Sequence, residues 1–143
     1  MRRLYPGILA IMLVASTVFG DVSCRLGSAG EGGADMRELI ISFEWRGSGC
    51  QLSSPSPELR VSGAPEGTAF LRVRMTDLDK PNFDHGGGTV DFDGSGAVAA
   101  GSLRDYRGPC PPSGSHTYRF DVEALAADRS SVLGRGSAER RYP

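Results

Sequence analysis

Five polar side chains that could build one small site stand at two places in this chain. Asp77 and Asp79 end one alternating segment and His85 follows them, whereas His116 and Tyr118 open another such segment. Imidazole and phenol groups donate hydrogen bonds to phosphate oxygens, and a neighbouring carboxylate orients an imidazole. The chain has 2 histidines. The set suggests one small polar site for an anion such as a phosphate head group. The alternative, which the residue pattern by itself favours, is that the carboxylates bind loop amides and the histidines pack at strand ends.

A proline-rich loop, Gly108-Pro109-Cys110-Pro111-Pro112, precedes His116. Proline fixes φ, so such a loop forms a rigid rim beside a strand-borne histidine. Gly108 permits close approach, and the amides that proline does not remove are available to an anion. The candidate ligand-binding residues are therefore Asp77, Asp79, His85, Gly108, Pro109, Pro112, His116 and Tyr118.

Metal chemistry has weaker support. The segment 91–96 begins like a calcium loop, but its twelfth position is Ser102, where a bidentate glutamate is required, so we expect a β-turn. A zinc site from Asp77, His85 and His116 has no short-spaced ligand pair to support it. We expect no metal and no cofactor.

Catalysis by a serine, histidine and aspartate set stays open as an alternative, with His116 and Asp77 as the pair. No nucleophile-elbow pattern is present, and Ser113 and Ser115 are ordinary turn residues beside glycine. We expect a protein that is not an enzyme.

Alternation of apolar and polar residues predicts the elements that must position these groups. Glycine- and proline-containing turns are frequent and no strong helical period is present, which indicates an all-β, antiparallel β-sandwich. We read residues 123–128 as the end of a strand rather than a helix. The predicted strands cover residues 38–45, 59–61, 71–76, 89–92 and 117–124, with a final strand ending near Tyr142.

The amino-terminal segment reads as an export signal. Residues 1–20 combine two early arginines, an apolar run over 8–19 and small residues before a cleavage point. The run is too short to span a bilayer comfortably, so we expect no transmembrane segment in the mature chain. A Gly-rich tether over 21–36 follows and contains Cys24, for which lipidation, intermolecular pairing or a free thiol stay open. We expect a periplasmic or secreted protein, with a lipid anchor as one alternative.

The net charge and the length of the chain limit the possible function classes and the number of domains. Removal of residues 1–20 takes away two arginines and no acid, so the formal net charge changes from −1 to −3. No basic face is evident, which argues against a nucleic-acid binder. The 123 residues that remain (143 − 20) suffice for one domain with one core, which we place at 37–143, after the tether.

Three blocks of the chain resemble the phosphatidylethanolamine-binding-protein family, whose bacterial branch is often labelled Raf-kinase-inhibitor-like. Residues 56–68 look like its SPxLxWSGxPxGT block, 77–81 are similar to its DPDAP motif, and 108–120 match its GxCPP…HxYxF block. Their order and spacing agree with the family over about residues 37–143. The resemblance implies a Greek-key β-sandwich of that family's type, in a short variant with little helix.

The resemblance also implies a ligand site at the residues named above and a binding or regulatory role. It places Cys50 and Cys110 in loops that border one pocket, so we expect a Cys50–Cys110 disulfide. Such a cross-link stabilises by roughly 4 kcal/mol on a chain-entropy argument. Two free buried thiols are the alternative.

The sequence departs from the family at several positions. Leu78 replaces the proline of DPD, Arg60 stands where tryptophan is usual, and three glycines, 86–88, follow His85 where the family has a bulky strand. We expect one pocket wall to be remodelled there. The glycines favour the alternative function, an envelope protein or protease-inhibitor module that binds a protein partner and has a vestigial pocket.

Overall fold

The structure, a computed structural model, describes residues 36–143. The predicted signal (1–20), Cys24 and almost all of the tether (21–36) lie outside the described residues. The strands are β1 (Arg37–Glu38), β2 (Ile40–Phe43), β3 (Leu59–Ser62), β4 (Phe70–Asp77), β5 (Asp84–Asp91), β6 (Ala97–Val98), β7 (His116–Leu125) and β8 (Val132–Tyr142). The described part is all-β, as predicted, and within it no helix has the length and apolar character needed to cross a membrane.

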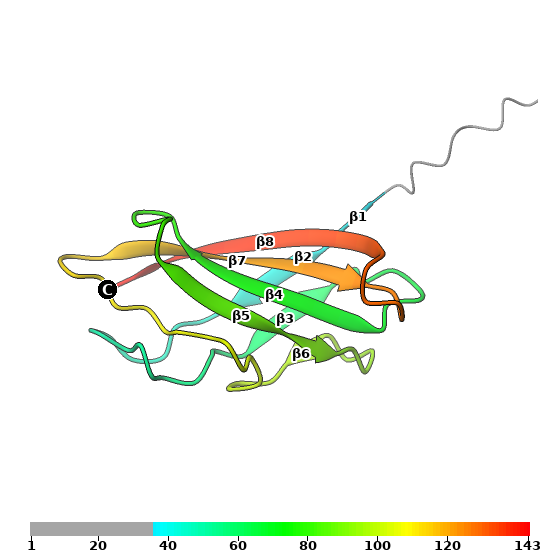
Figure 1. Cartoon of the computed structure of the whole chain (residues 1–143), viewed down its shortest axis with the longest axis horizontal. Coiled ribbons are helices and arrows are strands. Elements are labelled where there is room, and N and C mark those ends of the chain that lie inside the picture. Colours follow the sequence, from blue (N-terminus) through cyan, green and yellow to red (C-terminus); the bar gives the residue numbers. More distant parts are fainter. Residues whose placement is uncertain (1–35) are drawn as a thin grey trace, which may run out of the picture. The chain divides into compact units, whose positions relative to one another are not determined.

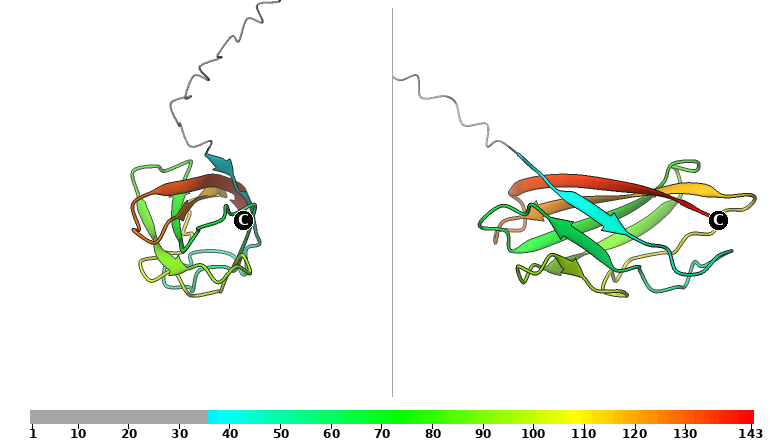
Figure 2. Two further views of the ribbon diagram at one scale, coloured as in Figure 1. Left: turned by 90° about the vertical axis from the view of Figure 1, so that its right-hand side faces the viewer. Right: turned by 180° about the vertical axis from the view of Figure 1, so that it is seen from behind.

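Two sheets pack face to face (Figure 1, and end-on in the left panel of Figure 2). The larger has the strand order β1-β8-β7-β4-β5 and the smaller the order β2-β3-β6. All pairs are antiparallel except β1 with β8, which is parallel, so the larger sheet is mixed rather than purely antiparallel. Because β4 pairs with both β5 and β7, the end of β4 lies beside the start of β7.

The single strand predicted over 38–45 is two strands in different sheets. β1 pairs with β8 in the larger sheet, and β2 pairs with β3 in the smaller one. Leu39, at the break, is buried and its amide donates to the carbonyl of Arg135 at 2.8 Å. The alternation of inward side chains continues through the crossing, which is why the sequence pattern does not reveal it.

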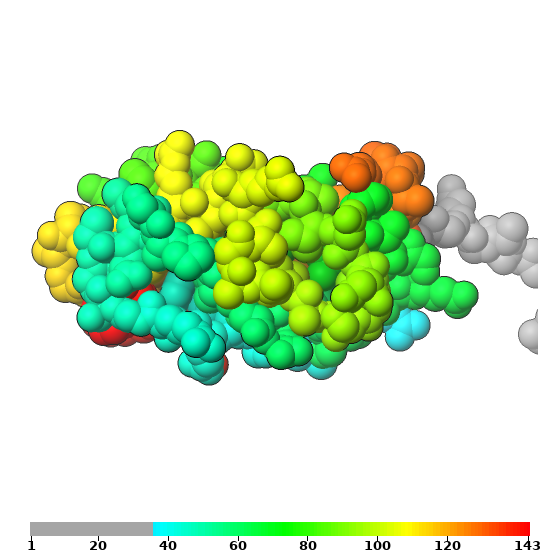
Figure 3. Space-filling model, turned by 90° about the horizontal axis from the view of Figure 1, so that it is seen from below, coloured from blue at the N-terminus to red at the C-terminus, as the bar shows by residue number. Residues whose placement is uncertain are grey.

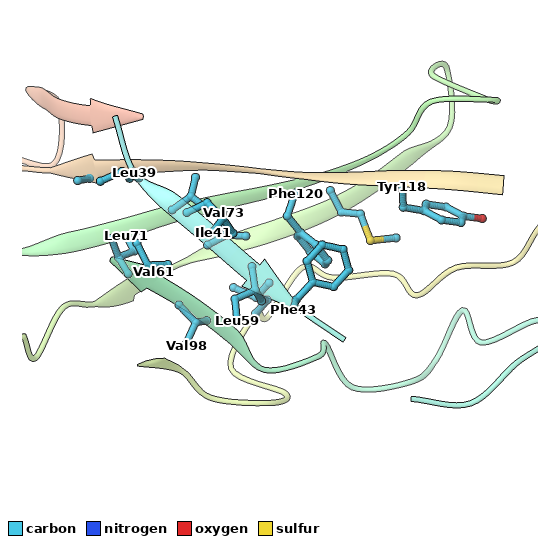
Figure 4. Close-up of a cluster of buried hydrophobic side chains, with 14 of the residues drawn as sticks. Leu39, Ile41, Phe43, Leu59, Val61, Leu71, Val73, Val98, Tyr118 and Phe120 are labelled. Carbon is cyan, nitrogen blue, oxygen red and sulfur yellow. The ribbon is translucent and has the colours of Figure 1, made fainter. Parts of the chain in front are cut away.

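The core lies between the two sheets. Inward side chains of both layers meet there, and Phe43 packs edge-on against Phe120 with ring centroids 4.8 Å apart. Figure 4 shows this contact within the wider cluster that also includes Leu39, Ile41, Leu59, Val61, Leu71, Val73 and Val98. Burial of this apolar surface is what holds the layers together.

Strand β5 is longer than predicted and β6 was not predicted, whereas β8 ends at Tyr142, where the sequence predicted the end of a final strand. β5 starts at Asp84 and includes the three glycines, and β8 contains two more. A Cβ atom built on Gly136 would lie 2.1 Å from the carbonyl oxygen of Leu39. Glycine in β8 therefore permits the close passage of the amino-terminal strand, although it weakens the strand signal.

A disulfide joins Cys50 to Cys110, which are 60 residues apart, as predicted. The two loops also bond through their backbones: Gln51 N donates to Pro109 O at 2.8 Å, and Gly108 N donates to Leu52 O at 3.1 Å. The space-filling view from below (Figure 3) shows these segments covering one face of the molecule. They form one wall at the end of the sandwich where β4 ends.

Candidate functional site

A hydrogen bond between Asp77 and His116 is the centre of the candidate site. Asp77 is the last residue of β4 and His116 the first of β7, and Asp77 pairs with Tyr118 in the ladder. Nδ1 of His116 lies 2.7 Å from Oδ2 of Asp77, and the two side chains are 13% and 4% exposed. The antiparallel register thus brings together two groups 39 positions apart.

The second oxygen of Asp77 holds the turn that follows β4. Oδ1 accepts hydrogen bonds from the amides of Asp79 at 2.9 Å and Lys80 at 3.0 Å. Burial raises the pKa of Asp77, but the bond from His116 and those two amides outweigh it, so the pKa lies below the ordinary value of 3.8. Asp77 is therefore an ionised carboxylate near neutral pH.

His85, at the start of β5, is fixed by the loop before Gly108. Its Nδ1 lies 2.9 Å from the carbonyl oxygen of Arg107, while the amide of Arg107 donates to the His85 carbonyl at 2.8 Å. Because a carbonyl only accepts, Nδ1 of His85 carries the proton of that bond.

Two glycines after His85 allow close packing on both sides of β5, Gly86 against the loop and Gly87 against β4. Gly86 has φ +66°, and a Cβ atom there would lie 1.8 Å from the carbonyl oxygen of Asp105. At Gly87 it would lie 2.0 Å from the carbonyl oxygen of Val73. The glycine run, read from sequence as a remodelled wall, is required by the packing of β5 between β4 and the loop.

Tyr118 lies between the two histidines. Its ring centroid is 5.2 Å from that of His85, in a T-shaped contact, and 6.3 Å from that of His116. Its hydroxyl is buried without a hydrogen-bond partner. Burial, with the nearby Asp77 carboxylate, raises the pKa of Tyr118 well above its usual range. Both imidazoles thus pack on one ring at one end of the molecule.

A cleft of about 430 Å³ opens at this end. Four residues singled out from the sequence line it, namely Asp77, His85, Cys110 and Pro112. Four others were missed: Leu52, Lys80, Asn82 and Phe83. Three of these belong to the short connection from Asp77 to His85, so their position between two predicted site residues was the available signal. Leu52 is brought in by the disulfide-linked loop, which no local pattern indicates.

The remaining predicted residues, Asp79, Gly108, Pro109, His116 and Tyr118, do not line this cleft. His116 is bonded to Asp77, which does line it, and Tyr118 is buried behind the two histidines. Asp79 is exposed and its Oδ2 accepts from the amide of Thr117 at 2.7 Å. Gly108 and Pro109 are buried behind the rim, and the amide of Gly108 already donates to Leu52. A Cβ at Gly108 would lie 2.0 Å from the carbonyl oxygen of Gln51. Asp79, Gly108 and Pro109 hold the turn and rim in place.

Two other places in residues 36–143 are weaker candidates for a functional site than this cleft. Asp77, Asp79 and His116 each offer a ligand atom within 4.8 Å of the others, but hydrogen bonds already engage Asp77 with His116 and Asp79 with Thr117. A hollow of about 630 Å³ lies over the outer face of the larger sheet. Three of its charges pair with one another, since Glu123 is bonded to Arg72 and Arg135. We therefore place the candidate site in the cleft beside Asp77.

Comparison with known proteins supports the family resemblance. The chain is similar to the UPF0098 protein YbcL of Escherichia coli (strain K12), with 32% identity over 123 residues. The match covers 66% of this chain, and the chain spans 66% of that relative's length. No family model and no solved structure matches the chain. Because the UPF0098 group is the phosphatidylethanolamine-binding-protein family, the chain is phosphatidylethanolamine-binding-protein-like.

Proposed function

We propose that this phosphatidylethanolamine-binding-protein-like chain is an exported binding protein whose cleft holds a small anion or phospholipid head group. The observation that carries the proposal is the bond that joins His116 to Asp77, which lines the cleft together with His85. An ionised Asp77 only accepts, so Nδ1 of His116 donates to it. Nε2 is then the ring nitrogen of His116 left for a ligand.

The same reasoning applies to His85, whose Nδ1 donates to Arg107. With both Nδ1 atoms committed as donors, each Nε2 donates to an anion only when its ring is an imidazolium. Binding of a phosphate is therefore expected to take up protons. Calorimetry of phosphate binding in two buffers of different ionisation enthalpy measures this uptake directly.

Calorimetric titration with inorganic phosphate tests the proposal. Wild-type protein should bind, and His116→Gln should weaken binding about tenfold or more, because a hydrogen bond to a charged group is lost. Arg60→Ala is the matched control, since it removes a cation from β3 in the other sheet. An affinity unchanged in His116→Gln, or no binding by the wild type, would contradict the proposal.

We propose further that the ligand is not chemically changed. Within residues 36–143, no serine, threonine or cysteine side chain is hydrogen-bonded to either histidine. A hydrolase needs an activated nucleophile or water at that position. Incubation with a chromogenic phosphate ester and a carboxylic ester should give no turnover above buffer. Turnover that disappears in His116→Ala would favour the hydrolase instead.

Export is also part of the proposal. The Cys50–Cys110 disulfide supports it, because such bonds persist in oxidising compartments and are rare in reducing ones. Cell fractionation followed by mass spectrometry of the mature chain should find a product cleaved near residue 20 outside the cytoplasm. The same spectrum shows whether Cys24 carries a lipid. A full-length cytoplasmic product would contradict export.

A further inference from the structure

We infer, on the basis of the proposed anion cleft, that its ligand is an amphiphile with an anionic head and no cationic group, and that Lys80 selects it. Three observations carry the inference: an unpaired cation in the cleft, a carboxylate that is already occupied, and an exposed apolar wall. None of them follows from the Asp77–His116 bond alone.

The cation is Lys80, which is the only lysine in the chain. It lines the cleft and stands where the DPDAP motif has alanine. Within residues 36–143, no carboxylate lies within 4.0 Å of its ammonium group. Its amide is held by Oδ1 of Asp77 at 3.0 Å and its carbonyl accepts from Phe83 at 3.0 Å. The backbone from which the ammonium extends is therefore fixed at the cleft.

The carboxylate is Asp77, the one acidic residue that lines the cleft. Oδ1 accepts from two amides and Oδ2 accepts from His116. The ammonium group of a zwitterionic head would need a carboxylate partner and would lie near the like charge of Lys80. The charge that the cleft leaves unpaired is positive, so it complements an anionic head that carries no amine.

The apolar wall consists of Leu52, Phe83 and Pro112, together with the disulfide-linked Cys110. Leu52 is 40% exposed and Phe83 is 42% exposed, and Leu78, directly after Asp77, is 36% exposed. The five exposed large hydrophobic side chains of the described region include these three. Phe83 also packs on the His85 ring at 4.6 Å. The wall thus begins next to the polar groups, which suits an alkyl chain attached to an anionic head.

Calorimetry with three soluble probes tests the inference: inorganic phosphate, dihexanoyl phosphatidic acid and dihexanoyl phosphatidylethanolamine, the lipids below their micelle concentrations. Wild-type protein should prefer the phosphatidic acid over the phosphatidylethanolamine about tenfold. It should bind the phosphatidic acid more tightly than phosphate, by roughly three- to fourfold for each methylene buried.

The variants identify the residues responsible. Lys80→Ala should bring the preference between the two lipids close to unity, whereas Arg60→Ala, which removes one cation elsewhere, should keep it. Phe83→Ser should weaken the binding of phosphatidic acid more than the binding of inorganic phosphate, because only the lipid has an alkyl chain to lay against this wall. The inference is overturned if the Lys80→Ala variant still prefers phosphatidic acid over phosphatidylethanolamine, or if the wild-type protein prefers phosphatidylethanolamine.

The outcomes also separate this inference from the proposed function. If phosphate and both lipids bind with equal affinity, the cleft is a site for free phosphate. The proposed function would then stand and the inference would fail. If the wild-type protein binds none of the three probes, both the proposed function and this inference are overturned.

Discussion

Asp77 connects three parts of the candidate site through one carboxylate. Its two oxygens accept from the His116 ring and from the amides of Asp79 and Lys80. The carboxylate therefore fixes the orientation of a histidine and the turn that carries the cleft lysine. His85 has no such carboxylate and is held instead by the Arg107 backbone. Two histidines on different strands are thus positioned by different means around Tyr118.

The lowered pKa of Asp77 makes stability depend on pH. A carboxyl whose pKa is lower in the folded chain than in the unfolded one contributes stability above the unfolded value of 3.8. That contribution is lost as pH falls below 3.8 and through the folded pKa. Urea unfolding at pH 7, 5, 4 and 3 should show the free energy of unfolding falling mainly below pH 4. Asp77→Asn should be less stable at pH 7 and show a shallower fall; an identical fall in both proteins would contradict this role.

At the same scale, the sequence predicted which polar residues lie near one another better than it predicted their contacts. Asp77, His85 and His116 were predicted from residue type and spacing, and the structure brings them around Tyr118. Lys80 was missed because a lone lysine in a turn has no periodic pattern. The rim residues Gly108 and Pro109 were assigned to the ligand, whereas backbone bonds to a distant loop bury them. Such long-range backbone pairing leaves no local sequence signal.

At the scale of elements, the loop 103–107 pairs with β5 through backbone hydrogen bonds and thereby fixes His85, which lies on that strand. The amide of Asp105 donates to the Gly87 carbonyl at 3.0 Å, just before the pair of bonds between His85 and Arg107. The strand can approach this loop because it lacks side chains at 86–88. The sequence predicted a strand only from residue 89, since glycine has low β-propensity and no side chain to show alternation.

Gly86→Ala tests this packing. The added Cβ would meet the Asp105 carbonyl at 1.8 Å and force a side chain into a positive φ, so we expect a loss of about 2 kcal/mol or more. Gly94→Ala is the matched control, because Gly94 has φ +85° with nothing within 4 Å of the added atom. Its cost should be only that of the backbone conformation, about 1 kcal/mol. Equal losses in urea unfolding would show that the contact with Asp105 is unimportant.

The disulfide makes a second prediction about elements. Cys50→Ser and Cys110→Ser should lower the melting temperature equally, and the double variant should be no worse than either, because each change removes the same bond. The loss should approach roughly 4 kcal/mol. Scanning calorimetry measures all three; additive losses would mean that the two sulfurs are not joined in solution.

At the scale of the whole molecule, the two-layer fold determines where the site can be. The end of β4, the start of β7 and the start of β5 meet at one end of the larger sheet, and the disulfide-linked loops cover that end (Figure 1). The all-β class was predictable, because inward apolar residues alternate along most strands. The crossing of the chain between sheets at Leu39 was not, because alternation is the same in either sheet.

The central claim is that His85, which lines the cleft, and His116, which is bonded to the cleft residue Asp77, both bind one anion there. It is tested most directly by titrating the folded protein with inorganic phosphate while following the imidazole resonances of His85 and His116 by nuclear magnetic resonance. We predict that both sets of resonances shift and saturate together with one binding constant. Resonances of both rings that stay unchanged at saturating phosphate, or only one ring responding, would contradict the account.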